Sequence, residues 1–293
     1  MTHNSLLLTT LSLSLVLTAC SGDDSSTSES TTTTASTTSG TTEGSTTEDS
    51  TTDDSTSTST TSDTTTDATS ETTGAAAMAM IRVVHLSPDA PAVDVFVVGV
   101  DEAVVKGLAV KNATDYLSVP AGPYAFAIAP AGGSIDDAVF TTPVLDLAAD
   151  TKYSAVAVGK LAPGNGDGGF NVVALVDSTD GLAAGQVRLQ VLHAAAAAPF
   201  AEVDVWEVSD PENPVPLIEN FKFEASGSLD VPSAALVVGL DVNNDGMPDA
   251  TFNVPALPAD SLVDVAAFSD AADAPSLQAV LGVGATTQLD PNP

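Results

Sequence analysis

The tract from Ser21 to Thr73 limits most strongly what this chain can fold into, because it contains almost nothing from which a core can be built. It consists almost wholly of Thr, Ser, Asp, Glu and Gly, without an aromatic residue, Lys or Arg, and without an apolar residue larger than alanine. Since no apolar burial offsets the entropy that ordering costs, we predict a disordered acidic tether over residues 20–80. As a flexible coil it would span about 45 Å. The dense Ser and Thr also suit an O-glycosylated stalk, and the sequence leaves this open.

An apolar segment precedes the tether. Residues 6–17 are apolar enough for the core of a signal peptide, but they are too few to cross a hydrocarbon layer of about 30 Å as a helix. The segment ends in Leu17-Thr18-Ala19-Cys20, which resembles the lipobox of bacterial lipoproteins. That resemblance implies that residues 1–19 are a lipoprotein signal peptide and that Cys20 becomes the acylated first residue, with palmitate as an expected modification. Residues 1–5 contain no Lys or Arg, which departs from the positive charge that such signals normally have there. An ordinary secretory signal followed by a buried cysteine is the alternative.

Lipidation would fix where the protein resides. Several acyl chains hold a protein firmly at a bilayer, whereas one chain holds it only marginally. Ser21 follows the cysteine, and by resemblance to the lipoproteins of enteric bacteria a residue other than Asp there favours the outer membrane. We therefore expect a lipid-anchored protein of the cell envelope, on the surface or the periplasmic face. Cys20 is the only cysteine, so disulfides within the chain are excluded.

The chain is strongly acidic. Its formal net charge is -32, and its first Lys or Arg is Arg82. A polyanion would be repelled by this field, and phosphate contacts need Lys and Arg, so nucleic acid is excluded as a partner. The acidity is expected to keep the protein solvated and monomeric while it concentrates cations, including calcium, near the surface.

Short apolar or alternating runs, separated by turns, begin at residue 81. Examples are Val93–Val97, Tyr124–Ala129 and Tyr153–Val158, with Gly-rich and Pro-rich turns among them. Runs of this length, spaced by roughly ten residues, are typical of β-sandwiches, and no sustained helical period follows the signal segment. The sequence therefore predicts an all-β fold.

The same pattern recurs about 110 residues later in the chain. Leu189–His193 corresponds to Ile81–His85, and Val203–Trp206 corresponds to Val93–Phe96. We infer two tandem β-sandwich domains, Ig-like or transthyretin-like, each of a size that can bury its own core. The first is predicted at residues 81–184 and the second at residues 187–290.

The opening of the first copy, Arg82-Val83-Val84-His85-Leu86-Ser87-Pro88-Asp89-Ala90-Pro91-Ala92-Val93-Asp94-Val95, resembles the bacterial domain-of-unknown-function family 4397. The later Val119-Pro120-Ala121-Gly122 fits the same family, and the resemblance covers residues 81–290. It implies a secreted, often lipid-anchored envelope protein with tandem β domains, and it brings no established activity and no catalytic residue. The second copy departs from the pattern at Ala194–Phe200, where the Ser-Pro-Asp-Ala-Pro turn is replaced.

The segment Asp241–Asp249 resembles the Asp-rich calcium loops set in β-hairpins of integrin-type propeller repeats. Oxygen ligands at alternate positions can converge on one hard cation, and Gly246 permits a tight turn between them. The candidate ligands are Asp241, Asn243, Asp245, Met247 through its carbonyl, and Asp249. An EF-hand is excluded because Phe252 stands where a bidentate Glu is needed. An ordinary polar hairpin turn without metal is the alternative.

Four further features have structural interpretations. Gly164–Gly169 has a single carboxylate among many glycines and is predicted to be a flexible hairpin loop. His85 and His193 occupy equivalent positions, where we expect hydrogen-bonded histidines beside a core. Trp206 corresponds to Phe96, which favours a core position.

The sequence specifies the fold more closely than the function. It contains none of the motifs of Ser hydrolases, zinc proteases or phosphate-binding loops, and only 4% of its residues are aromatic, which disfavours a sugar-stacking cleft. We therefore predict a non-catalytic protein that displays two β-sandwich domains to a protein or extracellular-matrix partner, with calcium as a stabilising cofactor. An envelope hydrolase that uses paired carboxylates is the alternative. A purely structural spacer would explain the tether but not the duplicated domain.

Overall fold

The computed structural model describes residues 76–281 and 284–293. Cys20 and the predicted tether up to residue 75 lie outside this part. The described residues form β-strands and two short 3-10 turns, η1 (Ile135–Asp137) and η2 (Ala198–Phe200), without an α-helix. No helix among them has the length and apolar character needed to cross a membrane. The predicted all-β sandwich class is confirmed.

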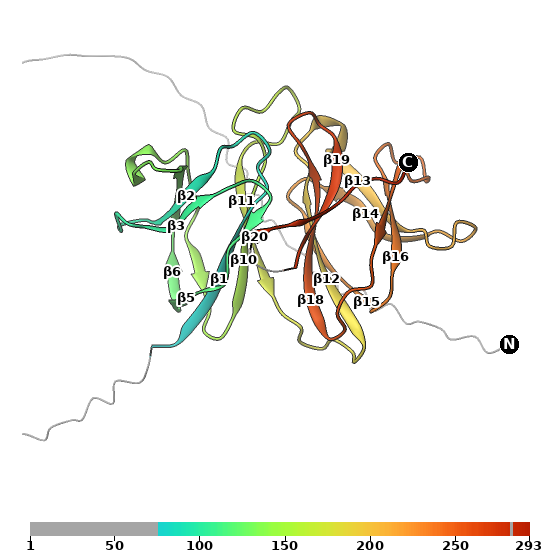
Figure 1. Ribbon diagram of the computed structural model, residues 1–293, viewed down its shortest axis with the longest axis horizontal. Helices are drawn as coiled ribbons and strands as arrows, with labels where there is room; N and C mark the ends of the chain where they lie inside the picture. Colours follow the sequence, from blue (N-terminus) through green and yellow to red (C-terminus); the bar gives the residue numbers. More distant parts are fainter. Residues whose placement is uncertain (1–75, 282–283) are drawn as a thin grey trace, which may run out of the picture. The chain divides into compact units, whose positions relative to one another are not determined.

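A first set of strands forms two main sheets (Figure 1). One sheet contains β11 (Asn171–Asp177), β10 (Lys152–Val158), β1 (Met78–His85), β4 (Asn112–Ala113) and β5 (Leu117–Pro120). The sheet facing it contains β3 (Ala103–Leu108), β2 (Val93–Val97), β7 (Phe126–Pro130) and β8 (Phe140–Thr141). A small ribbon of β6 (Gly122–Tyr124) and β9 (Leu145–Leu147) completes the set.

A second set repeats this arrangement. One sheet contains β15 (Ser226–Pro232), β12 (Gln186–Ala194), β18 (Ser261–Ser269), β19 (Pro275–Val280) and β21 (Thr287–Leu289). The other contains β14 (Val215–Lys222), β13 (Glu202–Glu207), β16 (Leu236–Asp241) and β17 (Ala250–Val254). One further strand, β20 (Gly284–Ala285), leaves the second set and pairs with β4 of the first.

The strand pairing of the two sets is equivalent. In the first set β1 pairs parallel with β10, with Ile81 opposite Tyr153; in the second β12 pairs parallel with β18, with Leu189 opposite Val263. The strands β2 and β13 each lie between two antiparallel neighbours. The division into domains at 81–184 and 187–290 stays a prediction, because β20 crosses between the sets and both belong to one compact unit.

The central strands are buried on both faces. In β1, Ile81 packs in the core of the first set, whereas Val84 packs in a separate apolar cluster that contains side chains of both sets. Successive side chains point to opposite faces of a strand. Six of the seven residues of β10 are therefore buried, and this explains why its sequence is an apolar run instead of an alternating one.

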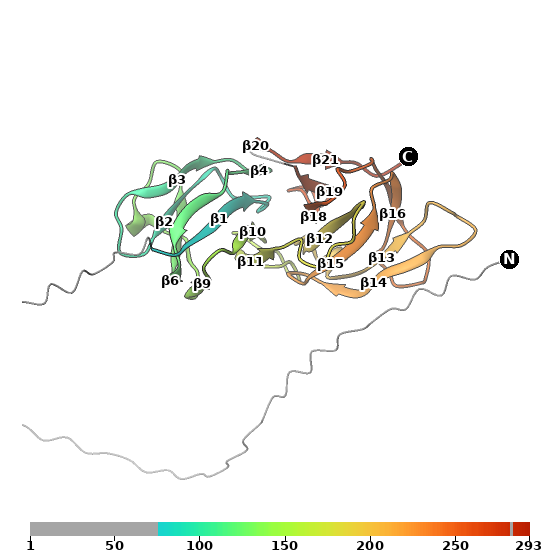
Figure 2. The ribbon, with the colours of Figure 1, turned by 90° about the horizontal axis from the view of Figure 1, so that it is seen from below.

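The shared cluster joins equivalent faces of the two sets. Figure 2 shows the strands of the two sets side by side. Val84 and Val156 of the first set contribute, and so do Leu192 and Ala266, which occupy the same register positions in the second. Phe268, which is 1% exposed, lies in the same cluster. The two sandwiches therefore bury the outer faces of their strands β1, β10, β12 and β18 against each other.

The repeated Val-Asp-Val motif has a structural role. The carboxylate of Asp94 accepts the backbone N–H groups of Gly107 (2.6 Å) and Gly132 (2.9 Å). Asp204 accepts the N–H of Asn220 (2.6 Å) in the same way. Both motifs lie where the register with the neighbouring strand shifts. The aspartates thus satisfy the N–H groups of Gly107 and Asn220, which a regular ladder would have paired, and Asp94 also holds the turn after β7.

Candidate functional site

The predicted calcium loop follows β16 and is closed by its own hydrogen bonds. Asp241 is fully buried, and its carboxylate accepts the N–H groups of Gly246 (2.8 Å), Asn243 (3.2 Å) and Asp245 (3.4 Å). Asp249 accepts the N–H of Val242 (2.8 Å). The carboxylates that would bind a cation are therefore already engaged by N–H donors of the loop.

The backbone of this loop has the turn character that the sequence suggested. Asn244 and Gly246 both have a positive φ, of 55° and 86°. Asp245 accepts the N–H of Met247 (3.0 Å), and the Met247 side chain is exposed. Among the described residues, no group of three or more His, Cys, Asp or Glu side chains is positioned to hold a metal ion. Calcium at this loop stays a prediction.

Isothermal calorimetry tests whether the loop Asp241–Asp249 binds calcium. If the loop opens to bind calcium, the chain from Ser21 to Pro293 should release or absorb heat at one cation per chain, and a variant with Asp245→Ala and Asp249→Ala should not. Asp210→Ala, in another exposed Asp-containing turn, is the matched control and should titrate like the wild type. A flat titration of the wild type would exclude the metal.

The Ser-Pro-Asp-Ala-Pro turn of the first copy anchors a loop. The hydroxyl of Ser87, which is fully buried, donates to the carbonyl oxygen of Gly159 (2.6 Å). The carboxylate of Asp89 accepts the N–H groups of Leu161 (2.8 Å) and Ala162 (2.9 Å). These residues hold the chain that leaves β10, which is a structural role.

The two equivalent histidines differ. His85 is hydrogen-bonded as predicted, with Nε2 3.1 Å from the carbonyl oxygen of Pro91. His193 is buried as predicted, but neither of its ring nitrogens makes a hydrogen bond of normal geometry in the described structure. Burial lowers the pKa of His193 to about 4, so the ring is neutral at physiological pH. Trp206 is only half-buried, whereas Phe96 is buried.

The loop Gly164–Gly169 is not a free hairpin. Lys160, which precedes it, pairs with Asp167 and with Asp273 of the second set, both at 2.8 Å. Asp167 also accepts the N–H of Ala198 (2.9 Å), and the N–H of Gly168 donates to the carbonyl of Ala196 (2.7 Å). The loop is therefore held to the second set by hydrogen bonds and an ion pair. Its glycine-rich sequence does not indicate these long-range contacts.

A polar cluster lies inside the junction of the two sets. The guanidinium of Arg82 donates to Asp264 across the junction and to the hydroxyl of Ser154 (2.6 Å). The oxygen of Ser154 lies 2.7 Å from Asp177 and 2.9 Å from Asp264. Gln190 of the second set donates to Asp177 (3.1 Å). Arg82 is thus the cation next to two buried carboxylates, Asp177 of the first set and Asp264 of the second.

Burial governs the electrostatics of this cluster. It raises the pKa of Asp264 from 3.8 to about 6, although Arg82 acts in the opposite direction. One oxygen of Asp264 has no hydrogen-bond partner in the described structure. Burial and the hydrogen bond to Asp177 (2.6 Å) also raise the pKa of Tyr116, so its phenol stays protonated. Two carboxylates with a single cation leave the junction with uncompensated negative charge.

Asp264→Asn should change the pH dependence of stability. The pKa of Asp264 is raised in the folded state, so its contribution to stability is complete below about pH 4 and is lost as pH rises through about 6. The shift corresponds to on the order of 3 kcal/mol. In urea unfolding, the free energy of unfolding of the variant should therefore rise relative to that of the wild type from pH 4 to pH 8. His193 titrates in the same window but is present in both proteins; a constant difference across this range would contradict the assignment.

A groove opens beside this cluster. It has a volume of about 830 Å³ and is lined by both strand sets. The first set contributes Arg82, Tyr116, Lys152 and the segment around Asp177, and the second contributes Pro255–Pro258 and Ser261–Val263. The Tyr116 ring lies 4.9 Å from the Arg82 guanidinium and 5.4 Å from the Lys152 ammonium. The floor of the groove is therefore polar and aromatic, and its walls are fixed by the junction.

A family model matches the first set together with the beginning of the second. Residues 79–206 match the family model described as a domain of unknown function (DUF4397). This stretch of the chain resembles DUF4397. The predicted resemblance is thus confirmed for residues 81–206, which include the turn that anchors the loop after β10. Its extension to residues 207–290 stays a prediction. No curated protein matches the chain.

The DUF4397 match contains most of the polar cluster but not all of it. Arg82, Ser154 and Asp177 lie within it, whereas Asp264 lies outside. Sequence reasoning missed this cluster because its members are spread over more than half of the chain. A signal was present: Arg82 and Asp264 are charged residues inside apolar strand runs, and a charge there needs a buried partner.

Proposed function

We propose that this protein is a lipid-anchored envelope protein that binds a protein or extracellular-matrix partner without catalysis, in the groove between its two strand sets. The groove is the observation that carries the proposal. Binding sites form preferentially where two structural units meet, and both sets contribute walls here. DUF4397 brings no activity that competes with this proposal.

The groove is suited to binding because it is preorganised. Its floor is held by Arg82, Ser154 and Asp177, whose hydrogen bonds are already made before a partner arrives. Lys152 and Thr179 are exposed at its sides and can contact a partner. A rigid surface loses little entropy on binding, which favours affinity.

Anchoring follows from Cys20 and the predicted tether. Lipid at Cys20 would hold the protein at the membrane, and residues 20–80 would let the strand sets reach a partner beyond it. Mass spectrometry of the exported polypeptide should give a chain that begins at Cys20 and carries acyl groups. A free thiol at position 20 would contradict the anchor.

Capture from envelope extracts tests the binding role. The chain from Ser21 to Pro293 should retain at least one component, and Ala256→Trp, which places an indole in the groove, should reduce that retention at least tenfold. Ala131→Trp, on an exposed loop of the first set, is the matched control. Repeated failure to retain anything, or equal retention by both variants, would contradict groove binding. A parallel capture with chelator measures any calcium requirement.

One observation favours the alternative, an envelope hydrolase. Asp177 and Asp264 both contact the Ser154 oxygen, and the raised pKa of Asp264 would suit a general acid. Both carboxylates are buried and bonded to neighbouring side chains, so binding without catalysis is the better supported function. A screen of glycoside and ester substrates distinguishes the two: turnover that Asp264→Asn abolishes would establish the hydrolase.

A further inference from the structure

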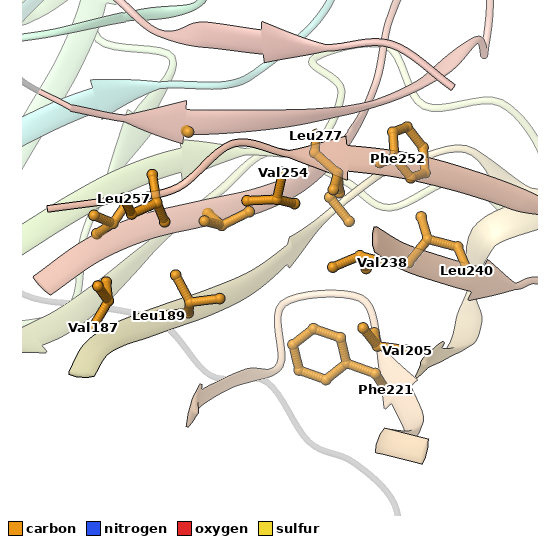
Figure 3. Close-up of a cluster of buried hydrophobic side chains, with 14 of the residues drawn as sticks. Val187, Leu189, Val205, Phe221, Val238, Leu240, Phe252, Val254, Leu257 and Leu277 are labelled. Carbon is orange, nitrogen blue, oxygen red and sulfur yellow. The ribbon is translucent and has the colours of Figure 1, made fainter. Parts of the chain in front are cut away.

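The second strand set contains an apolar cavity that the first set lacks. It lies between the two sheets of the set and has a volume of about 370 Å³, whereas the corresponding space in the first set is about 50 Å³. Figure 3 shows side chains from both sheets around this core, among them Leu189, Val205, Phe221 and Val238. Two sandwiches with the same strand pairing therefore differ in how completely their interiors are filled.

The register of the strands explains part of this difference. Phe126 lies opposite Val97 in the first set, and Val238 lies opposite the equivalent residue, Glu207, in the second. Two residues before each of these stand Tyr124, the last residue of β6, and Leu236, the first residue of β16. The first set therefore has two aromatic side chains, Tyr124 and Phe126, where the second has two aliphatic ones, Leu236 and Val238.

In the first set the Tyr124 and Phe126 rings stack with their centroids 6.0 Å apart. In the second set Leu236 and Val238 leave that space open and both line the cavity. Replacing large side chains by smaller ones leaves a cavity wherever the surrounding backbone cannot close on it. Here the backbone is held by the strand ladders of both sheets.

The cavity lining indicates its occupant. It is made mainly of Leu, Val and Ala side chains. Its few polar residues include Glu207, the last residue of β13, and Ser209, two residues later. The Glu207 carboxylate accepts the N–H of Ser209 (2.9 Å). An apolar cavity stays dry and takes up apolar molecules, and one of about 150 Å³ already accepts benzene. A volume of about 370 Å³ lies in the range of small-molecule sites.

We propose that the second strand set binds one small hydrocarbon-chain molecule between its sheets, with an uncharged or cationic polar end beside Glu207. A carboxylate end is disfavoured because Glu207 stands at that end and the chain carries a net charge of -32. This site is separate from the groove in which the partner is proposed to bind, and neither proposal depends on the other.

Fluorescence of N-phenyl-1-naphthylamine, an uncharged apolar probe, tests the site in the chain from Ser21 to Pro293. We expect saturable binding of one probe per chain and displacement by 1-decanol. Decanoate at pH 8 should displace the probe at least tenfold less well than decanol. Failure of the wild type to bind the probe, or equal displacement by decanol and decanoate, would overturn the proposal.

The first set supplies the variant that fills the cavity. Leu236→Tyr with Val238→Phe copies Tyr124 and Phe126, and the new hydroxyl has an equivalent acceptor, since Tyr124 donates to Pro120 and Pro232 occupies the matching position. We expect at least a tenfold loss of probe affinity. Val215→Phe, at an exposed position of β14, is the matched control and should bind like the wild type.

Thermal unfolding shows whether the double variant folds. A filled cavity should keep or raise the melting temperature, whereas overpacking would lower it. Should the pair prove too large, Val238→Phe alone keeps the same comparison. Probe affinity that is unchanged in a folded, filled variant would overturn the proposal.

Discussion

Arg82→Met is expected to destabilise the folded protein by about 3–5 kcal/mol at pH 7. The Arg82 side chain is 9% exposed, and its guanidinium is the cation that Asp177 and Asp264 share in the junction. Removing it leaves two buried carboxylates without a counter-charge, and an uncompensated buried charge costs far more than an ion pair contributes. Guanidinium or urea unfolding measures the loss directly.

A surface ion pair provides the control for Arg82. Lys106 pairs with Glu102 at 3.1 Å, with both side chains largely exposed, so Lys106→Met should cost less than about 1 kcal/mol. Adding Asp264→Leu to Arg82→Met should recover part of the stability, because it removes one of the two stranded carboxylates. Equal losses for Arg82→Met and Lys106→Met would show that the junction does not depend on the buried charge pair.

Gly159→Ala is the second change with a large expected effect. Gly159 follows β10 with a φ of 80°, and an added Cβ would overlap the carbonyl oxygen of Gly169 and lie 2.5 Å from its carbonyl carbon. These are backbone atoms of a loop bonded to the second set, so they cannot rotate away. We expect a loss of about 3 kcal/mol or more, since left-handed strain and a backbone clash add together.

Gly181 isolates the conformational part of that loss. Its φ is 75°, and an added Cβ would meet no atom within 4 Å. Gly181→Ala should therefore cost only the left-handed penalty of about 1–2 kcal/mol. Both variants are measured by thermal and denaturant unfolding. If they lose the same stability, the loop after β10 does not pack as closely as described.

Much of the fold was predictable from local patterns. The strand around Ile81–His85 and its counterpart Leu189–His193 were identified because apolar runs bounded by turns have a strong local signature. The pairing that makes these strands equivalent, parallel to β10 and β18, depends on residues about 70 positions away. No local pattern carries that information.

The junction and its groove could not be predicted for a related reason. An apolar run such as Tyr153–Val158 indicates burial on both faces, but it does not say what covers the second face. The partner of Arg82 lies 182 residues away, at Asp264. The cavity in the second set depends on which residues occupy equivalent positions of the two sets, such as Phe126 and Val238, and this equivalence follows from the strand register.

Site-specific photo-crosslinking locates the proposed partner most directly. A benzophenone side chain in place of Thr179, exposed in the groove, should crosslink to the component captured from envelope extracts. The same group in place of Val144, which is 67% exposed between β8 and β9, should not. Crosslinks from position 179 alone are the predicted result. Equal yields from both positions, or crosslinks from position 144 alone, would contradict binding in the groove.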